Sequence, residues 1–460
     1  MRKIFYIIMP VLMAIIVITR VESYEKEHPR SFDESVYPLL ASQLFVDPAN
    51  YNTVGLYENF LKQRGRKLPD YFSKPLFKHP PVFPYLIRFS YSVFGVSQVS
   101  AFRVSLAMGM LLMILAYLIG RELFDDVTGI CAALLMTIEP VSWICSQKIW
   151  METTVAFFMI AALYLFVLFI KRGSRYFMYA CGLMAGLAFL CKYPGILVVP
   201  AILIFAIIYE RKVVKDIHFW ISLALPFFIS IPWFYWNFKV FGPGIFQSLY
   251  ANHDMPNVVI YAMQRKEFPQ GLLLLSIALP VLFWLFNKKE ALHKAVFVSI
   301  GAGLVYIIAG NIMNTLKLTY VPEAGWRMGL FGGVPWHFYL GRLVELSPFY
   351  FISFLSIFYA AFKEERRKEH MLLLITAGVI LSFYIIWGNY QSRYITSVSV
   401  PLFVLCAANI VFLFRKANDI KRTWAQKAYI YGLGVVVLYF FGKTVLVGSV
   451  LAVPNGICYF

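Results

Sequence analysis

The chain has 460 residues, of which 60% are hydrophobic and only 14% are charged. Typical soluble domains carry about 25% charged residues, so this apolar excess excludes a single water-soluble globule and predicts a protein that is solvated by lipid. The formal net charge is +18. In a membrane protein we expect this excess of basic residues to reflect their placement on one membrane side rather than nucleic-acid binding.

Apolar runs of about 20 residues predict membrane-spanning helices. Thirteen runs fit, at 4–20, 99–119, 127–145, 151–170, 176–191, 195–209, 218–236, 271–287, 295–311, 347–362, 371–387, 396–414 and 425–448. The first run lacks a small-residue cleavage site after it, so we expect an uncleaved span. The predicted fold class is therefore an all-α polytopic membrane protein, with one transmembrane domain over 1–460 and no separate soluble domain.

Basic residues occur in alternate short loops, which predicts that these loops and the N-terminus are cytoplasmic. The loops are 171–175, 211–215, 288–294, 363–368 and 415–422. The long first loop, 21–98, then lies outside, and its segment Val82 to Phe94 is aromatic and apolar, which predicts a helix in the membrane interface. The six cysteines show no C-x-x-C spacing or disulfide framework, so we expect free thiols.

Two adjacent carboxylates, Asp33 and Glu34, follow the first span by about a dozen residues. Ser31 and Glu34 fit the capping box, which would leave Asp33 free on the first turn and predicts a mild effect of Glu34→Gln. Tyr37 shares the helical face of Asp33. The alternative is that the helix dipole alone favours this acidic pair at a helix start.

Other ionisable residues gather at the predicted outer ends of the spans, where they are functional candidates. They include Lys78, Arg103, Lys148, Glu152, Lys192 and Arg393. Simpler explanations are snorkelling for Lys78 and Lys192, an orienting ion pair for Arg103 and interfacial anchoring for Arg393-Tyr394. Carboxylates and cations at one membrane face nevertheless suit a reaction on a lipid-linked phosphate ester. Glu139, beside Pro140, is expected to serve only packing or pairing.

Six elements, in order, resemble motifs of the GT-C membrane glycosyltransferases, above all protein O-mannosyltransferases and the aminoarabinose transferases that modify lipid A. They are Asp33-Glu34-x-x-Tyr37, the stretch from Phe77-Lys78-His79-Pro80-Pro81 to Arg103, Lys148 to Thr153, Gly186 to Gly195, Pro335 to Leu340, and Ser392-Arg393-Tyr394 to Pro401. The resemblance covers residues from about 30 to 401. Glu152 stands where Asp is commoner, and Phe77 stands where the aminoarabinose branch often has a metal-associated Glu.

This resemblance implies a GT-C fold with about thirteen transmembrane helices and interfacial helices in the first outer loop. It implies an inverting transfer of a sugar from a polyprenyl-phosphate donor to an acceptor hydroxyl or phosphate at the outer face of a prokaryotic plasma or inner membrane. Asp33 and Glu152 are the expected catalytic carboxylates. The expected donor or substrate contacts are Glu34, Tyr37, Lys78, Arg103, Lys148, Lys192, Arg393 and Tyr394.

The resemblance leaves the acceptor open among a protein, a glycolipid and an envelope polymer. No cofactor is required by the sequence. The outer histidines lack H-x-x-x-H spacing, which argues against a metal site, but a requirement for a divalent metal stays open. The rival hypothesis is a transporter or flippase for a lipid-linked or anionic substrate. Such a protein should distribute ionisable residues through the membrane depth and show broken helices in two repeated halves, whereas here the charges gather at the outer side.

Overall fold

The computed structural model describes residues 2–26, 33–47, 49–63, 70–242, 338–363, 365–387, 391–420 and 422–451. Every regular element in these ranges is an α-helix or a short 3₁₀-helix, as the predicted all-α class requires. The predicted spans 271–287 and 295–311 lie outside the described residues, and so does Ser31, the cap of the proposed capping box.

The first half of the chain forms a long helix, a set of short helices and then a helical bundle. The elements are α1 (Arg2–Lys26), α2 (Asp33–Val46), α3 (Val54–Gln63), η1 (Asp70–Ser73), α4 (Val82–Phe94), α5 (Gln98–Leu123), α6 (Asp126–Ile138), α7 (Pro140–Ser146), α8 (Glu152–Arg172), α9 (Arg175–Cys191), η2 (Tyr193–Leu197), α10 (Val198–Tyr209), α11 (Arg211–Val214) and α12 (Ile217–Phe241). The helix expected in the interface has the predicted bounds, since α4 is Val82–Phe94.

The C-terminal part adds a second group of helices to this bundle. They are α18 (Phe338–Leu346), α19 (Phe349–Phe362), α20 (Arg367–Trp387), η4 (Ser392–Ile395), α21 (Thr396–Lys416), η5 (Ala417–Asp419) and α22 (Thr423–Leu451). Among the described residues, 6 helices are long and apolar enough to cross a membrane, or 7 if the bent pair α6 and α7 counts as one span. The predicted number of thirteen spans is therefore not reached by these criteria, in part because α9, α10 and α19 are shorter than a full span.

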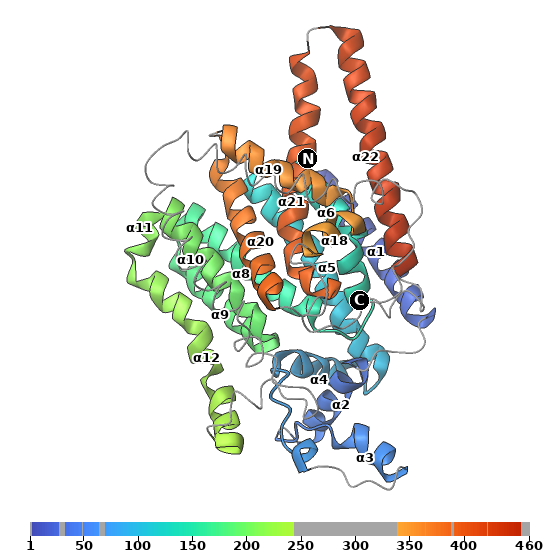
Figure 1. Cartoon of the computed structure of the whole chain (residues 1–460), viewed down its shortest axis with the longest axis vertical. Helices are drawn as coiled ribbons and strands as arrows, with labels where there is room; N and C mark the ends of the chain where they lie inside the picture. The colour runs from blue at the N-terminus through green and yellow to red at the C-terminus, as the bar shows by residue number, and fades with distance from the viewer. Residues whose placement is uncertain are drawn as a thin grey trace.

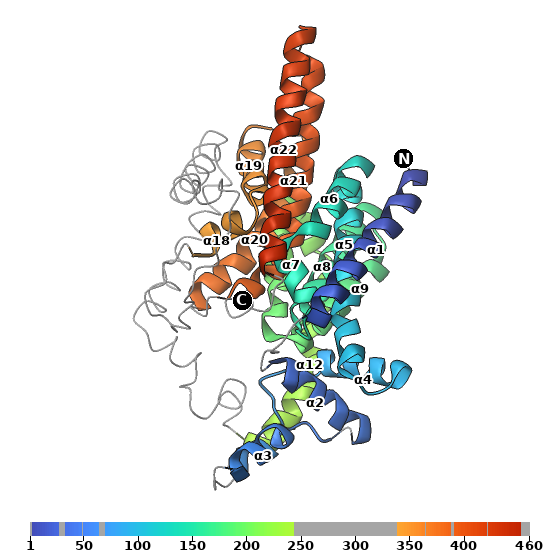
Figure 2. The ribbon, with the colours of Figure 1, turned by 90° about the vertical axis from the view of Figure 1, so that its right-hand side faces the viewer.

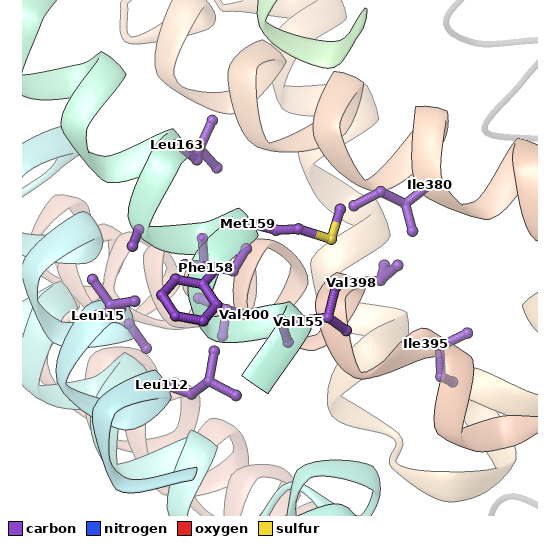
Figure 3. Packing of buried hydrophobic residues seen from close by; sticks show 14 of the residues in the cluster. Leu112, Leu115, Val155, Phe158, Met159, Leu163, Ile380, Ile395, Val398 and Val400 are labelled. Atoms are coloured by element: carbon purple, nitrogen blue, oxygen red, sulfur yellow. The ribbon is translucent and has the colours of Figure 1, made fainter. Parts of the chain in front are cut away.

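The centre of the bundle is formed by α8 and α21, the candidate spans with the largest buried share, 78% and 83%. Side chains from α5, α8, α20 and α21 interdigitate there (Figure 3). Leu112 of α5 and Phe158 of α8 face Val400 of α21, and Met159 reaches toward Ile380 of α20. Close packing of this kind makes the helix ends that project from the bundle well-defined supports for a site.

Short helices and basic loops lie at opposite ends of the molecule. Figures 1 and 2 show α2, α3 and α4 together at the lower end, which we call the site end, while the junction of α21 and α22 projects at the upper end. Because α8 begins at the site end and is 21 residues long, the basic segment after it lies toward the other end. This arrangement agrees with the predicted alternation of the first outer loop and the basic loops.

Two structural details explain how the bundle turns at its ends. Gly173 has a φ of 66°, so it ends α8 in the left-handed conformation that glycine adopts without strain. A Cβ on Gly195 would lie 2.2 Å from the carbonyl oxygen of Ala188, so only glycine lets η2 fold back this closely on α9. The predicted runs 176–191 and 195–209 are thus joined by a tight turn, and Lys192 lies at this turn.

The apolar run 127–145 is not one straight helix. It divides into α6 and α7, which meet at an angle of 61° beside Glu139. The buried Glu139 carboxylate caps α7 by accepting two first-turn amides at 3.1 and 2.6 Å, and Tyr350 of α19 donates its hydroxyl to it at 2.7 Å. Arg20 of α1 donates to the Thr137 carbonyl at 2.8 Å, near the end of α6. Glu139 therefore has a structural role, as expected, but it caps α7 and accepts from Tyr350 and forms no ion pair with the described residues.

The described cysteines are free, as predicted: Cys145, Cys181, Cys191 and Cys406 are buried, and Cys131 is half-buried. Cys458 lies outside the described residues.

Candidate active site

The candidate site begins at the first turn of α2. Asp33 is the first residue of this helix, and its Oδ2 accepts from the Arg393 guanidinium of η4 at 2.7 Å. Burial raises the pKa of Asp33, but Arg393 and the neighbouring cations oppose it, and the net pKa lies below the usual 3.8. Asp33 is therefore an ionised carboxylate that remains partly exposed, with 26% of its side chain accessible.

Glu34 faces away from this exposed position and into the protein. Its Oε2 lies 3.7 Å from the Lys148 Nζ, and both side chains are fully buried. Its Oε1 accepts from the backbone amide of Ile149 at 3.2 Å. Glu34 therefore ties α2 to the loop between α7 and α8, which is a larger structural role than the capping that the sequence predicts.

A second carboxylate stands on the same side at the start of α8. The Oε1 of Glu152 accepts from the Lys192 Nζ at 2.8 Å and lies 3.6 Å from the Arg393 Nε. Burial lowers the pKa of Lys192, but Glu152 outweighs it and the net pKa is raised, so Lys192 is a stable ammonium. Arg393 thus connects both predicted catalytic carboxylates, Asp33 and Glu152.

Aromatic rings enclose these cations. The Arg393 guanidinium lies 4.7 Å from the ring centre of Trp150, and the Lys192 ammonium lies 4.3 Å from that of Tyr394. Tyr394 in turn stacks on Tyr384 of α20, with ring centres 5.2 Å apart. Cation–π contacts orient a charged head without neutralising it, so both cations keep their charge for a ligand.

Lys78 is the cation of this region that forms no ion pair or hydrogen bond with the described residues. Burial lowers its pKa, Asp33 raises it, and Arg393 and Lys192 lower it again, with a lowered pKa as the result. These influences place the ammonium within the electrostatic field of the carboxylate and the two other cations. A half-buried, uncompensated cation among like charges is suited to receive an anion.

The loop that carries Lys78 is held by aromatic residues. Tyr51 donates its hydroxyl to the carbonyl of His79 at 2.7 Å, and Tyr193 donates to the carbonyl of Phe77 at 2.6 Å. Tyr37 lies with its hydroxyl 3.5 Å from the His79 Nδ1. Burial and the neighbouring Lys78 lower the pKa of His79 to about 3, so the imidazole is neutral.

One predicted phosphate contact lies elsewhere. Arg103 is exposed on α5, and its guanidinium lies over the ring of Phe94 at 4.4 Å. No described carboxylate of the site pairs with it, and we leave it out of the candidate site. The reason is geometric: the sequence places Arg103 at the correct end of its span but does not determine which side of the helix it occupies.

Several aromatic contributors are not among the predicted site residues. Trp150 and Tyr193 lie within the motif stretches Lys148 to Thr153 and Gly186 to Gly195, whereas Tyr384 lies outside the motifs. The Trp233 indole of α12 donates to the Tyr193 hydroxyl at 3.1 Å. Phe77 packs edge-on against Trp233 at 4.9 Å. Aromatic residues are abundant throughout this chain, so abundance could not single these out, whereas adjacency to a motif residue marked Trp150 and Tyr193.

No group of three or more His, Cys, Asp and Glu residues in the described part of the chain could hold a metal ion. The described residues of the site therefore supply charge through lysine and arginine, and no step below is assigned to a metal.

This geometry defines a class of protein: a polytopic helical membrane protein that holds carboxylates and cations at one end of its bundle. Known structures share its fold. ArnT from Cupriavidus metallidurans bound to undecaprenyl phosphate superposes with a TM-score of 0.52 at 14% identity, covering 97% of this chain and 76% of that one. The oligosaccharyltransferase AglB from Archaeoglobus fulgidus, in complex with an inhibitory peptide and a dolichol-phosphate, gives 0.53 at 18% identity, covering 96% and 56%.

Sequence comparison finds a family match over about a third of the chain. Residues 78–236 match the model of the dolichyl-phosphate-mannose-protein mannosyltransferase family. An uncharacterised protein of Aquifex aeolicus (strain VF5) is 23% identical over 276 residues, which are 58% of this chain and 54% of that protein. The chain thus spans about half the length of this curated relative. The predicted resemblance to the protein mannosyltransferase and aminoarabinose transferase type agrees with the family match over residues 78–236 and with the shared fold over nearly the whole chain.

Proposed function

We propose that this chain is an inverting glycosyltransferase that moves a sugar from a polyprenyl-phosphate donor to an acceptor hydroxyl at the outer face of a prokaryotic membrane. One observation carries the proposal: Asp33, Glu152, Lys192 and Arg393 come from separate elements and meet in one ion-paired cluster at the site end. The donor-like lipid phosphates named in the two related structures, an undecaprenyl phosphate and a dolichol-phosphate, support a substrate of this class.

The chemical step is a single displacement at the anomeric carbon. The ionised Asp33 accepts the proton of the acceptor hydroxyl while the hydroxyl oxygen forms a bond to the anomeric carbon. The bond from that carbon to the phosphate oxygen breaks, and its electron pair leaves with the prenyl phosphate. General-base assistance of this kind contributes about 10²–10⁴-fold to the rate.

The leaving phosphate needs positive charge, because negative charge grows on it in the transition state. Lys78 and Arg393 are the residues we assign to it. Lys78 forms no ion pair with the described residues although Asp33 is near, and Arg393 contacts both carboxylates of the cluster. A phosphate bound to Arg393 partly neutralises the guanidinium. Asp33 then experiences less positive charge, which raises the pKa of its carboxyl. Donor binding thereby makes Asp33 a better base.

Glu152 has a different role from Asp33. It is buried, and it contacts Lys192 and Arg393 at 2.8 and 3.6 Å, so we assign it to positioning these cations. The resemblance implies that Glu152 is a catalytic carboxylate, whereas its contacts favour a role in positioning the cations.

The experiment compares Asp33→Asn with Asp47→Asn in reconstituted membranes. Both changes keep an oxygen acceptor, but Asp47 is an exposed residue after α2 whose Oδ1 accepts only from the local Ala49 amide, at 2.9 Å. We expect Asp33→Asn to insert normally and to lower release of prenyl phosphate from radiolabelled polyprenyl-phosphate sugars by about 10²–10⁴-fold. Asp47→Asn should retain wild-type release. Near wild-type transfer by Asp33→Asn would remove the base from the mechanism and favour a transporter.

A further inference from the structure

A cavity on the far side of α2 from Asp33 lies outside the candidate active site. It has a volume of about 370 Å³ and lies between α2, the start of α3, the end of α4 and the beginning of α5. Its lining is Ser35, Pro38, Leu39, Ser42, Leu56, Tyr91, Val96, Ser97 and Gln98. The volume is near the lower end of the range of ligand pockets, about 300–1,000 Å³.

The chemistry of this lining is polar but uncharged. Five of the nine side chains carry a hydroxyl or an amide, the other four are apolar, and none is acidic or basic. A phosphate or carboxylate would find no counter-charge here, and an acyl chain would leave the polar groups without water. Hydroxyls and amides that both donate and accept, beside apolar patches, match the alternating polar edges and apolar faces of a sugar ring.

A tyrosine hydroxyl that opens to the cavity points to the same ligand class. Tyr91 lines the cavity and is only 3% exposed as a whole, and its hydroxyl forms no hydrogen bond with the described residues. Burial raises the pKa of Tyr91 to about 12, so the hydroxyl stays protonated and can donate. Because this hydroxyl makes no bond within the described protein, it is available to a ligand hydroxyl.

The position of the cavity connects it to the reaction. Ser35, on its rim, is two residues along α2 from Asp33. Figure 1 shows α2 and α4 next to each other at the site end. A saccharide held here lies beside the helix whose first residue is the proposed base.

We propose that this cavity binds an uncharged saccharide, namely the non-reacting sugar portion of the acceptor. The binding of a saccharide is independent of the proposed function, whereas its role as part of the acceptor rests on that function. The acceptor would accordingly be a glycan or glycolipid in which one sugar unit is anchored at Tyr91 and a hydroxyl further along the molecule reaches Asp33.

The test measures binding without any donor. The full chain in lipid nanodiscs is titrated with two neutral disaccharides, maltose and N,N′-diacetylchitobiose, and followed by saturation-transfer NMR. Tyr91→Phe removes only the hydroxyl, and Gln98→Ala removes a second polar group from the lining. The matched control is Ser92→Ala, because Ser92 is the exposed neighbour of Tyr91 and its hydroxyl bonds only carbonyls of its own helix, at 3.0 and 3.1 Å.

We expect saturable binding of at least one disaccharide, weakened about 2–10-fold in Tyr91→Phe, which is the effect of one neutral hydrogen bond. Gln98→Ala should weaken it similarly, and Ser92→Ala should not change it. Absence of saturable binding, or equal binding by Tyr91→Phe, would overturn the proposal. Disaccharide binding by a chain that transfers no sugar would support this site and refute only the proposed function.

Discussion

The buried pair of Glu34 and Lys148 gives a prediction that departs from the sequence-based expectation. Capping alone predicts that Glu34→Gln is mild, because a glutamine can still reach the cap amide. In the structure the same change removes the negative charge 3.7 Å from the Lys148 ammonium, and both side chains are fully inaccessible. We therefore expect Glu34→Gln to destabilise the protein strongly.

The magnitude follows from the 3.7 Å separation of the Lys148 Nζ and the Glu34 Oε2. With an effective dielectric constant of about 20, two unit charges at this distance attract each other by about 4–5 kcal/mol. Removing one member of a buried pair costs about 3–5 kcal/mol in measured cases, and replacing both members by neutral groups of similar volume is often nearly neutral. Lys148→Met should thus be as harmful alone as Glu34→Gln, and the double variant should recover much of the loss.

The assay is the thermal unfolding midpoint of the purified protein and of the four members of the double-mutant cycle. The matched control is Glu58→Gln, which breaks an exposed pair with Lys62 at 2.6 Å and should change the free energy of unfolding by no more than about 1 kcal/mol. Additive effects of the two single changes, or a wild-type midpoint for Glu34→Gln, would refute the reasoning.

Four further outcomes are expected. Lys78→Gln should weaken binding of labelled undecaprenyl phosphate by about 10–150-fold, the effect of losing a charged hydrogen bond, whereas Arg103→Gln should stay within about 2-fold; equal losses would return Arg103 to the site. The lowered pKa of Asp33 means that it stays ionised, and contributes to stability, above its usual pKa of 3.8. That contribution is lost as the pH falls through the lower folded-state pKa, so a pH profile of transfer should show no loss of Asp33 ionisation between pH 5 and 8. Gly195→Ala should lower the unfolding midpoint through about 1–3 kcal/mol of overpacking against Ala188, and an unchanged midpoint would show that η2 can move away from α9.

Sequence reasoning located the long helices well because an apolar run is a one-dimensional signal. The runs 99–119, 151–170 and 396–414 correspond to α5, α8 and α21. It missed the break in 127–145 because apolar composition continues through the bend, although Glu139 precedes a proline, a position that disfavours the helical conformation. Glu139 indeed has φ −62° and ψ 119°.

The sequence predicts which residues form the candidate site, but not which of them form ion pairs with one another. Topology and motifs placed Asp33, Glu152, Lys192 and Arg393 at one membrane face, and the structure brings these four into contact. The same reasoning included Arg103, because knowledge of the membrane side gives the depth of a residue and not its direction around a helix. The inward turn of Glu34 toward Lys148 likewise depends on tertiary packing, which outweighs the local capping signal.

The break between α6 and α7 has a consequence for the order in which the protein is made. Synthesis proceeds from the N-terminus, so α1 and the broken helix enter the membrane while the last quarter of the chain is still on the ribosome. Arg20 can then donate to the carbonyl of Thr137. Tyr350 has yet to be translated, so the Glu139 carboxylate lacks the hydrogen bond from the Tyr350 hydroxyl. Asp33 likewise waits for Arg393. These polar contacts therefore form only once the later helices have been synthesised and inserted, and a chain truncated before Tyr350 leaves the Glu139 carboxylate without that hydroxyl and Asp33 without Arg393.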